Sequence, residues 1–573
     1  MTVKKKGIAL YYQVEEEIKK KILNHEWKSG FRIPSEAELS DYFHVSRSTI
    51  RAAIAELISS GFLFSRQGSG TYVSEPSYSR KRFSQNPSDL ICKYIYNPFI
   101  QNDEIFSYAN ILRLNEAHVL MLRNHDFLTQ EETKKILEYI TELKTRDSSA
   151  LQFEPEYEDY YLNFEHNLIQ KLGIEIAGKI GMARSRNDMI PAVTRMNARD
   201  MTFVVMQDEM RLIGQLLQMA KRYQSAVMTG YTHLQPSRPI TLGFYFLAIS
   251  ESLLREQRHL ADIFEEMNLS PLGACAFSGT GLLIDRHYYA EILGFAGIVE
   301  NTLDAVASRD FLLELSSAFA AVGSLLGRFA EDLYLWSTKE YGYLELDDSV
   351  CCSSASMAQK KNPLSIEHIK SKISHLLAAY TDIFICLKGV SYQHCRDLIE
   401  CTIPFQNSFQ ELRAVLELLM ETLQRVSFCT EIMEREADRN GCAISGFAEF
   451  FVMRRGITFR IAHNIVESAV KQCISEKIEI RDMPVEILNR VAENVMGKSL
   501  HMTQEELNRM FNPHEAVEFY TSEGSPSGPS IETMLRHQVN QLEEAQERYH
   551  RNYSMVEQAY HNLEKTVQDM IKD

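Results

Sequence analysis

Residues 353–363 read SSASMAQKKNP, a polar stretch with two adjacent lysines that lies between long amphipathic segments. It is one of four polar islands in the sequence; the others are GMARSRNDM at 181–189, GYTHLQPSRP at 230–239 and SPLGACAFSGTG at 270–281. Islands of this kind at helix ends carry many hydrogen-bond donors and acceptors. We therefore expect a functional site to be built from them.

The segments between the islands have the apolar spacing of helices. The clearest examples are residues 202–224, 240–267 and 310–336, in which apolar side chains recur every three or four positions. Strand-like alternation is scarce in the same part of the chain. This pattern predicts a mainly α protein whose large body, residues 96–573, is an all-α helical bundle.

The first 75 residues follow a different pattern. Apolar residues recur at roughly helical spacing from 8 to 22, and the turn SGFRIPSE at 29–36 ends that segment. Two short helices are then expected, capped by Ser35 and Ser46. The run FLFSRQGSGTYV at 62–73 alternates around a Gly-rich turn, which is typical of a two-stranded wing. The order predicts a winged helix-turn-helix over residues 1–75.

A winged helix of this kind places the start of its second short helix in the major groove of DNA. Residues 1–85 hold 14 basic and 9 acidic residues, a net charge of +5 in a chain whose net charge is -16. A polyanion is therefore attracted to the head and repelled by the body. A protein-interaction module is the alternative, although it leaves the two arginines of that helix without an evident role. The candidate DNA-binding residues are Arg47, Ser48, Thr49, Arg51, Arg66, Gln67 and Gly70.

The head also resembles a known family. LYYQVEEEIKKKI, the IPSE turn, VSRSTIRAAIAEL and RQGSGTYV occur in the order of the winged helix of GntR-type bacterial regulators, over residues 8–75. The resemblance implies a double-stranded DNA operator as partner. Ala37 stands where many members of that family have an arginine, which implies a different operator.

Residues 76–95 are rich in Ser, Pro and Arg without sustained periodicity, and we interpret them as a linker. The ten cysteines include no CxxC pair, so we expect reduced thiols and no metal site. The sequence has no P-loop and no GxGxxG motif, so no nucleotide cofactor is expected. We recognise neither an apolar run of about 18 residues nor a secretory signal, which favours a cytoplasmic protein without a membrane span.

The polar islands together resemble a second family. ARSRND, GYTHLQ, SPLGA with the following IDR, ENTLDAVASRDF and SMAQKKNP occur in the order and at the spacing of argininosuccinate lyase, a member of the fumarase and aspartase superfamily. FNPHEAVEFYTSEGSPSGPS resembles its small C-terminal domain, here expected at about 430–545. The resemblance implies elimination of fumarate without a cofactor. It also implies a homotetramer in which each active site draws on three subunits.

The second resemblance also implies roles for individual residues. The base that removes a carbon-bound proton falls on Ser354, and Lys360 supplies the positive charge that a serine base requires. His233 shuttles a proton or stabilises the leaving group, and Glu367 orients its imidazole. The implied substrate-binding residues are Ser185, Arg186, Asn187, Thr232, Asn362, Arg309 and Asp159.

The chain departs from the family's pattern at several of these places. Ser353, Ala355 and Ala358 stand where the family's serine loop has Gly, Ser and Pro, and Tyr161 stands where the family has a histidine. Where the family pattern reads YNRDLQEDK, this chain reads HCRDLIECT at 394–402. His394, Ile399 and Thr402 therefore stand at the positions of the family's Tyr, Gln and Lys. A buried polar group that loses its partner costs about 1–3 kcal/mol. We therefore expect argininosuccinate itself to be a poor substrate.

Three functions remain open on these grounds. The chain is a DNA-binding regulator whose body eliminates fumarate from an N-succinyl amino-acid adduct, a regulator that only senses such a metabolite, or an argininosuccinate lyase with an incidental head. Retention of Ser354, His233, Lys360 and Glu367 favours the first over the second. The changes at the arginine end weaken the third.

Overall fold

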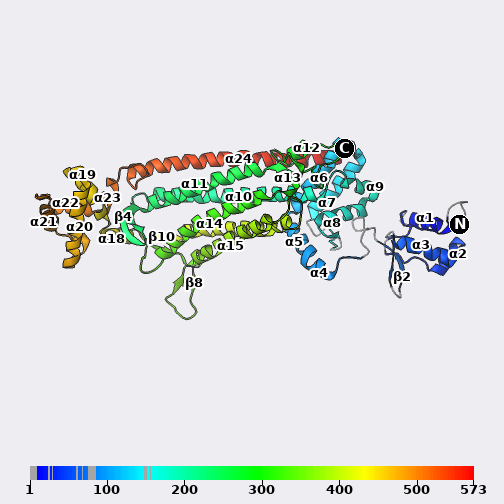
Figure 1. Cartoon of the computed structure of the whole chain (residues 1–573), viewed down its shortest axis with the longest axis horizontal. Coiled ribbons are helices and arrows are strands. Elements are labelled where there is room, and N and C mark those ends of the chain that lie inside the picture. Colours follow the sequence, from blue (N-terminus) through cyan, green and yellow to red (C-terminus); the bar gives the residue numbers. More distant parts are fainter. Residues whose placement is uncertain are drawn as a thin grey trace. The chain divides into compact units, whose positions relative to one another are not determined.

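The structure is a computed structural model of the whole chain, and it describes residues 9–23, 26–28, 30–59, 62–66, 69–74, 85–146, 151, 153–154 and 157–572. The chain divides into two compact units. One comprises Met1–Met182 with Lys565–Asp573, and the other comprises Ala183–Glu564. The protein is mainly α-helical, as predicted (Figure 1).

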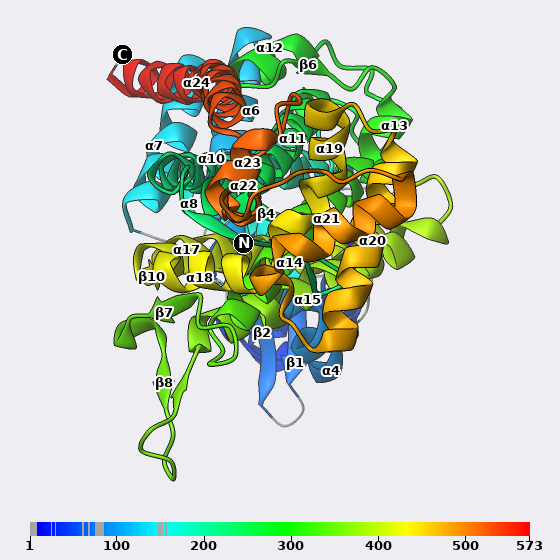
Figure 2. The same cartoon turned by 90° about the vertical axis from the view of Figure 1, so that its left-hand side faces the viewer.

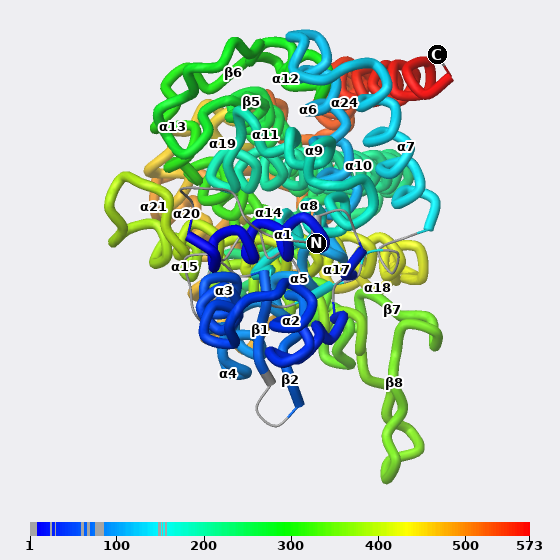
Figure 3. The backbone as a smooth tube through the Cα atoms, turned by 90° about the vertical axis from the view of Figure 1, so that its right-hand side faces the viewer, coloured from blue at the N-terminus to red at the C-terminus, as the bar shows by residue number. Residues whose placement is uncertain are grey.

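The N-terminal elements form the predicted winged helix-turn-helix (Figure 3). Helices α1 (Leu10–Leu23), α2 (Glu36–Phe43) and α3 (Arg47–Ser59) precede an antiparallel hairpin of β1 (Leu63–Arg66) and β2 (Gly70–Val73). Their buried apolar side chains make one core, which includes Ile18, Leu39, Ile50, Leu57 and Leu63.

Both predicted helix caps of the head are present. The side chain of Ser35 accepts from the backbone of Glu38, and the Glu38 carboxylate accepts in return from the Ser35 backbone at 2.8 Å, which is a capping box. Ser46 Oγ accepts from the backbone N–H of Thr49 at 3.2 Å. His44 between them adopts φ 55°, a left-handed conformation that ends α2 sharply.

The rest of the first unit is also helical. It contains α4 (Asp89–Ile91), the π-helical turn η1 (Cys92–Tyr96), α5 (Asn97–Phe106), α6 (Tyr108–Asn124), α7 (Gln130–Arg146), α8 (Tyr160–Leu172), α9 (Ile174–Ala177) and the 3-10 turn η4 (Gly178–Gly181). Residues 76–84 of the expected linker lie outside the described residues. The last part of that linker, from Asp89 onwards, is helical.

The second unit is built on five long helices (Figures 1 and 2). They are α10 (Arg186–Arg222), α11 (Leu242–Met267), α14 (Asp310–Trp336), α15 (Leu364–Lys388) and α17 (Thr402–Gln424), which pack in that order, with α17 closing back on α10. The long C-terminal helix α24 (Gly528–Lys572) lies along α11, to which it is joined by Arg548 through Asp262 and Glu265. Among the described helices, α14 alone is long and apolar enough to cross a membrane, a test that the core helix of a soluble protein also passes, and α14 packs within this bundle.

Short elements connect the bundle helices. Strands β3 (Val227–Thr232) and β4 (Gln235–Thr241) form a hairpin between α10 and α11. The excursion between α11 and α14 contains β5 (Leu269–Ser270), α12 (Arg286–Ile292), β6 (Gly297–Ile298) and α13 (Thr302–Ala307). Beyond α14 lie β7 (Leu344–Leu346), the 3-10 turn η5 (Asp348–Val350), and the strands β8 (Cys352–Ser353) and β9 (Lys361–Asn362); α16 (Asp397–Glu400) precedes α17, and β10 (Val426–Phe428) pairs with β7.

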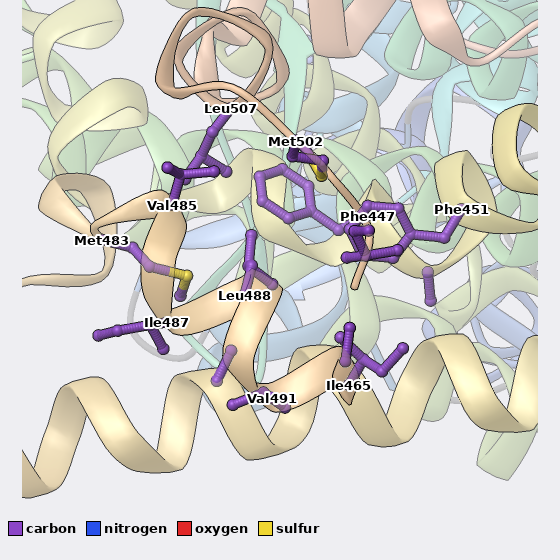
Figure 4. Packing of buried hydrophobic residues seen from close by; sticks show 14 of the residues in the cluster. Phe447, Phe451, Ile465, Met483, Val485, Ile487, Leu488, Val491, Met502 and Leu507 are labelled. Carbon is purple, nitrogen blue, oxygen red and sulfur yellow. The ribbon is translucent and has the colours of Figure 1, made fainter. Parts of the chain in front are cut away.

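A small helical subdomain follows the bundle. It comprises α18 (Thr430–Arg439), the 3-10 turn η6 (Cys442–Gly446), α19 (Phe447–Arg455), α20 (Phe459–Glu476), the 3-10 turn η7 (Ile480–Asp482), α21 (Val485–Met496), α22 (Gln504–Phe511) and α23 (Pro513–Phe519). Figure 4 shows its core, in which Phe447, Phe451, Ile465, Leu488 and Leu507 come together from four helices.

One buried carboxyl group in the bundle is unfavourable to stability. Glu209 on α10 is 0% exposed, and neither of its carboxylate oxygens has a hydrogen-bond partner among the described residues. Burial, with a smaller contribution from Glu256, raises the pKa of Glu209 well above its usual value. The amide of Gln257 on α11, 1% exposed, also has no partner in the described part of the chain.

We expect Glu209→Gln to stabilise the protein at neutral pH. In the folded protein Glu209 keeps its proton up to its raised pKa, whereas in the unfolded chain it loses the proton at its ordinary pKa. The free energy of unfolding therefore falls as pH rises from the ordinary pKa towards the raised one. The gain should be larger at pH 8 than at pH 4, because the unfolded chain is ionised at this position only at the higher pH. Thermal unfolding at fixed protein concentration measures it, with Glu251→Gln on the exposed part of α11 as control. An equal gain at pH 4 and pH 8 would show that ionisation of Glu209 is not the cause.

Candidate active site and DNA-binding surface

The first candidate segment is the start of α10. Ser185 caps this helix: its side chain accepts from the backbone N–H of Asn187, and its own backbone N–H donates to Asp188. The capped turn holds Arg186 and Asn187 at the helix end, where unpaired backbone N–H groups favour an anion. Asn187 Nδ2 also donates to the carbonyl of Ala276 at 3.0 Å.

Asp188, which sequence reasoning did not select, connects this helix end to the island at 270–281. Its Oδ2 accepts from the backbone N–H groups of Gly273 at 3.0 Å and Cys275 at 2.7 Å. Burial raises the pKa of Asp188 to about 6, while its backbone hydrogen bonds act in the opposite direction. The spacing Ser185-x-x-Asp188, a capping-box pattern, was the available signal.

The second candidate segment is the tip of the hairpin β3–β4. Thr232 pairs with Gln235, and the two residues between them, His233 and Leu234, have φ of 55° and 57°. Two successive left-handed residues are the signature of a type I′ turn, which is rare for side chains other than Gly, Asn and Asp. The turn places Thr232 and His233 on the exposed tip of the hairpin.

The third candidate segment is the hairpin of β8 and β9, which projects from the bundle in Figures 1 and 2. Ser354 is half-buried, and its Oγ accepts from the backbone N–H of Met357 at 3.2 Å. Lys360 is exposed, whereas Lys361 is tied to Asp348 by an ion pair of 2.7 Å. Asn362, opposite Cys352 at the base of the hairpin, contacts the Cys352 sulfur at 3.5 Å. The loop therefore presents the candidate base Ser354 together with Lys360, a lysine that has no ion pair among the described residues.

Two of the predicted site residues have local partners within one protomer. Glu367 in the first turn of α15 accepts from the Tyr334 hydroxyl at 3.3 Å, and no hydrogen bond joins it to His233 among the described residues. Asp159 lies in the first unit, where its carboxylate caps α8 by accepting from Leu162 at 3.0 Å. Each carboxylate has a local partner in this structure.

Arg309, which is predicted to clamp a carboxylate, is enclosed at the start of α14. Its side chain is 1% exposed and donates to the carbonyls of Val306 and Ser308, which lie just before α14. Burial lowers its pKa to about 10. Within this protomer Arg309 therefore holds backbone carbonyls, because its own helix start encloses it.

At the altered positions of the segment 394–402, the histidine is uncharged and the threonine hydroxyl has a local hydrogen-bond partner. Burial, and then the charges of Arg309 and Arg186, lower the pKa of His394 to about 4, so its imidazole is neutral at pH 7. Thr402 Oγ1 donates to the carbonyl of Ile399 at 2.8 Å. The Thr402 hydroxyl therefore already has a local partner for its proton. It stands where the family pattern has a lysine.

The candidate segments lie at different ends of the bundle. α10 has 37 residues, which span about 55 Å at 1.5 Å per residue. Ser185 precedes its first residue, whereas Thr232 follows beyond its last, so the length of this helix separates them (Figure 1). A reaction at a single carbon atom cannot use both from one copy of the chain.

The DNA-binding candidates lie mostly on one surface of α3. Arg47, Ser48 and Arg51 are exposed, and the Thr49 hydroxyl contacts Ser46 Oγ at 2.8 Å. Arg51 donates through Nε and Nη2 to the carboxylate of Glu36, at 3.1 and 2.7 Å.

In the wing, Gly70 has φ 123°, and a Cβ there would lie 2.7 Å from Arg32 Nε. The positive φ favours glycine at this position, and a larger residue would also displace the Arg32 side chain. Gln67 and the side chain of Arg66 lie outside the described residues.

Three family models match the chain. Residues 10–73 match the bacterial regulatory proteins of the gntR family, residues 100–377 match the lyase family, and residues 443–518 match the argininosuccinate lyase C-terminal family. The first match covers the winged helix described above. The third lies within the small subdomain after the bundle.

Similar proteins cover most of the chain. Argininosuccinate lyase 1 of Shouchella clausii is 32% identical over 485 residues, which are 84% of this chain and 97% of that protein. Argininosuccinate lyase of Hahella chejuensis is 34% identical over 389 residues, 68% of this chain and 83% of that protein. Both similarities extend far beyond the polar islands.

Solved structures give the same result. EDDS lyase in complex with formate has a TM-score of 0.75 at 26% identity, covering 86% of this chain and 97% of its own. Class II fumarase of Schistosoma mansoni has a TM-score of 0.61 at 14% identity, covering 79% and 98%, and shares the fold. The chain therefore belongs to the argininosuccinate lyase family, with the body of a carbon–nitrogen lyase and a GntR-type winged helix at its head.

Proposed function

We propose that this protein is a DNA-binding transcriptional regulator whose body eliminates fumarate from an N-succinyl amino-acid adduct. The observation that carries the proposal is the combination of Ser354 and Lys360 on one projecting hairpin with Thr232 and His233 on another, in a chain of this family. An EDDS lyase variant with bound fumarate is among the similar structures, at 26% identity and a TM-score of 0.75. The DNA-binding half rests on the exposed start of α3.

The chemistry assigns one task to each group. Ser354, as alkoxide, takes the proton from the carbon beside a carboxylate, and the negative charge that develops on that carboxylate is met by Lys360 and Asn362. The electron pair then forms the double bond while the carbon–nitrogen bond breaks. His233 gives a proton to the departing amine. Fumarate and an amino compound leave.

We further propose that the active site forms between copies of the chain, in a homotetramer. Ser185 and Thr232 lie at opposite ends of a helix about 55 Å long, so they can meet only if a second copy packs antiparallel to the first. The same arrangement brings Glu367 of one copy to His233 of another. Paired heads on such an assembly suit a palindromic operator. A regulator of this kind acts in the cytoplasm.

Each of the two alternative functions predicts a different result with these adducts. A sensor without turnover binds the same adducts but releases no fumarate. An argininosuccinate lyase of arginine biosynthesis requires efficient turnover of argininosuccinate. The neutral His394 and the locally satisfied Thr402 argue against the second alternative.

The test is to incubate the purified tetramer with a panel of N-succinyl amino acids, argininosuccinate included, while following fumarate absorbance. We expect fumarate from at least one adduct. For argininosuccinate we expect fewer than about one turnover per second, the low end of typical enzymes, because the groups that read its arginine end are changed. Turnover of argininosuccinate at typical enzyme rates would favour the biosynthetic alternative. Tight binding without fumarate from any adduct would favour the sensor.

A further inference from the structure

The start of α10 and the loop of residues 272–276 are joined by one carboxylate. Asp188 is 0% exposed, and its two oxygens accept three backbone N–H bonds: from Ser185 at 2.9 Å, Gly273 at 3.0 Å and Cys275 at 2.7 Å. One bond closes its own helix cap. The other two reach a loop more than eighty residues away in sequence.

The loop has an unusual backbone that these hydrogen bonds hold. Gly273 has φ 80°, and a Cβ there would lie 2.8 Å from Cγ of Arg286 and 2.9 Å from Cδ1 of Ile284. Cys275 has φ 54°, a left-handed conformation that costs a residue with a side chain about 1–2 kcal/mol. Arg286 holds the other side of the loop by donating to the carbonyl of Leu272 at 2.9 Å. The Asp188 bonds fall on the two residues of positive φ, of which Cys275 is strained.

The loop in turn orients Asn187, one of the predicted substrate-binding residues. Asn187, the neighbour of Asp188, donates through Nδ2 to the carbonyl of Ala276, the residue after Cys275. The orientation of the Asn187 amide therefore depends on where the loop lies. Ser185 and Arg186 share the same capped turn, so a shift of the loop would reach all three.

We propose that Asp188 is a positioning residue, which locks loop 272–276 onto the start of α10 and so fixes Ser185, Arg186 and Asn187 for the substrate. The inference rests on the proposed function for the identity of that substrate. Asp188 is not within hydrogen-bond reach of a ligand, since it is fully buried and its described partners are backbone N–H groups. It acts only through the loop and the cap.

The lock is sensitive to protonation. The ionised carboxylate accepts all three bonds most strongly, because a neutral carboxyl is a weaker acceptor and its proton opposes the N–H group that faces the protonated oxygen. Burial raises the pKa of Asp188 to about 6, so the group is mostly ionised at pH 7.5 and mostly protonated at pH 5. The charged and titratable groups near it are Cys275, Arg286 and Tyr289, of which Arg286 is the cation. We expect the loop to loosen as pH falls through about 6.

Hydrogen exchange measures directly how firmly loop 272–276 is held. It is followed in the peptide that contains Gly273 and Cys275 and is corrected for the intrinsic effect of pH on exchange. The wild-type tetramer should lose about tenfold of its protection between pH 7.5 and pH 5, as the carboxylate is titrated. Asp188→Asn should show the weak protection at both pH values, whereas Asp200→Asn, on the exposed side of the same helix, should behave as wild type. Gly273→Ala should reproduce the Asp188→Asn result with the carboxylate intact. Protection that is independent of pH in the wild type would overturn the proposal even if no variant folds.

Fumarate affinity, measured by calorimetry, separates positioning from a merely structural role. Wild type should bind fumarate at least about tenfold more weakly at pH 5 than at pH 7.5, and Asp188→Asn should bind weakly with no inflection near pH 6. An unchanged affinity and pH profile in folded Asp188→Asn would overturn the inference. Absence of fumarate binding to the wild type at pH 7.5, with the loop protection as expected, would instead contradict the proposed function and leave only the lock.

Discussion

Replacing Arg47 and Arg51 by alanine should abolish specific DNA binding while leaving the winged helix folded. Each arginine that reads a base edge contributes about 1–3 kcal/mol, so the pair should weaken operator binding by roughly 30-fold to 20,000-fold. The fold should survive, because Arg47 is exposed and the surface ion pair of Arg51 with Glu36 stabilises by at most about 1 kcal/mol. Fluorescence anisotropy with a duplex selected from a random library by the intact protein measures the change.

A control variant that loses the same number of positive charges distinguishes contacts to base edges from general electrostatic attraction to DNA. Lys135→Ala with Arg146→Ala removes two positive charges from the surface of α7, outside the winged helix. This variant should bind the selected duplex within about threefold of wild type at physiological salt, since neither residue belongs to the winged helix and salt weakens general electrostatic attraction. Equal binding by the Arg47/Arg51 variant and wild type would show that α3 is not the recognition helix.

Ser354→Ala should lower the rate of fumarate formation by about a hundredfold to ten-thousandfold, the usual contribution of a general base. The structure predicts little loss of stability, because Ser354 Oγ makes one hydrogen bond, to the Met357 backbone, in a projecting loop. Ser353→Ala is the matched control: it removes a hydroxyl from the adjacent, exposed residue. Comparable losses in both variants would mean that the loop as a whole, rather than the Ser354 hydroxyl, is required.

The sequence predicted those parts of the fold that depend on local pattern. The apolar spacing of residues 310–336 gave the bounds of α14, and Ser35 and Ser46 cap the helices of the head as expected. Side-chain periodicity and capping are properties of a single segment, so they can be read without knowing what the segment packs against.

The parts that sequence reasoning missed depend on tertiary contacts. The enclosure of Arg309 at the start of α14, with hydrogen bonds to backbone carbonyls, comes from contacts that its motif does not show, and its role as a carboxylate clamp stays a prediction. The role of Asp188 arises from a loop more than eighty residues further along the chain. The resemblance implied that Ser185 and Thr232 come from different subunits, but the distance between them in one protomer follows from the length of α10. None of these features leaves a periodic signal in one segment.

The candidate site stays a prediction, and the structure shows where its residues lie in one protomer. Some occupy two hairpins and the start of α10, whereas Glu367, Arg309 and Asp159 lie at the starts of other helices. If copies of the chain complete the site, as we propose, a ligand bound between subunits has a route to act on the heads.

The most direct test of this account is a titration of the Ser354→Ala tetramer with the adduct that wild type turns over, in the absence and presence of operator DNA. The variant binds without consuming the ligand, because Lys360, Asn362 and Thr232 remain. If the ligand shifts the assembly that holds the heads, linkage requires operator DNA to change ligand affinity by the same factor, typically 5- to 150-fold. We predict such a difference between the two dissociation constants. Equal constants would show that head and body share a chain without acting on each other.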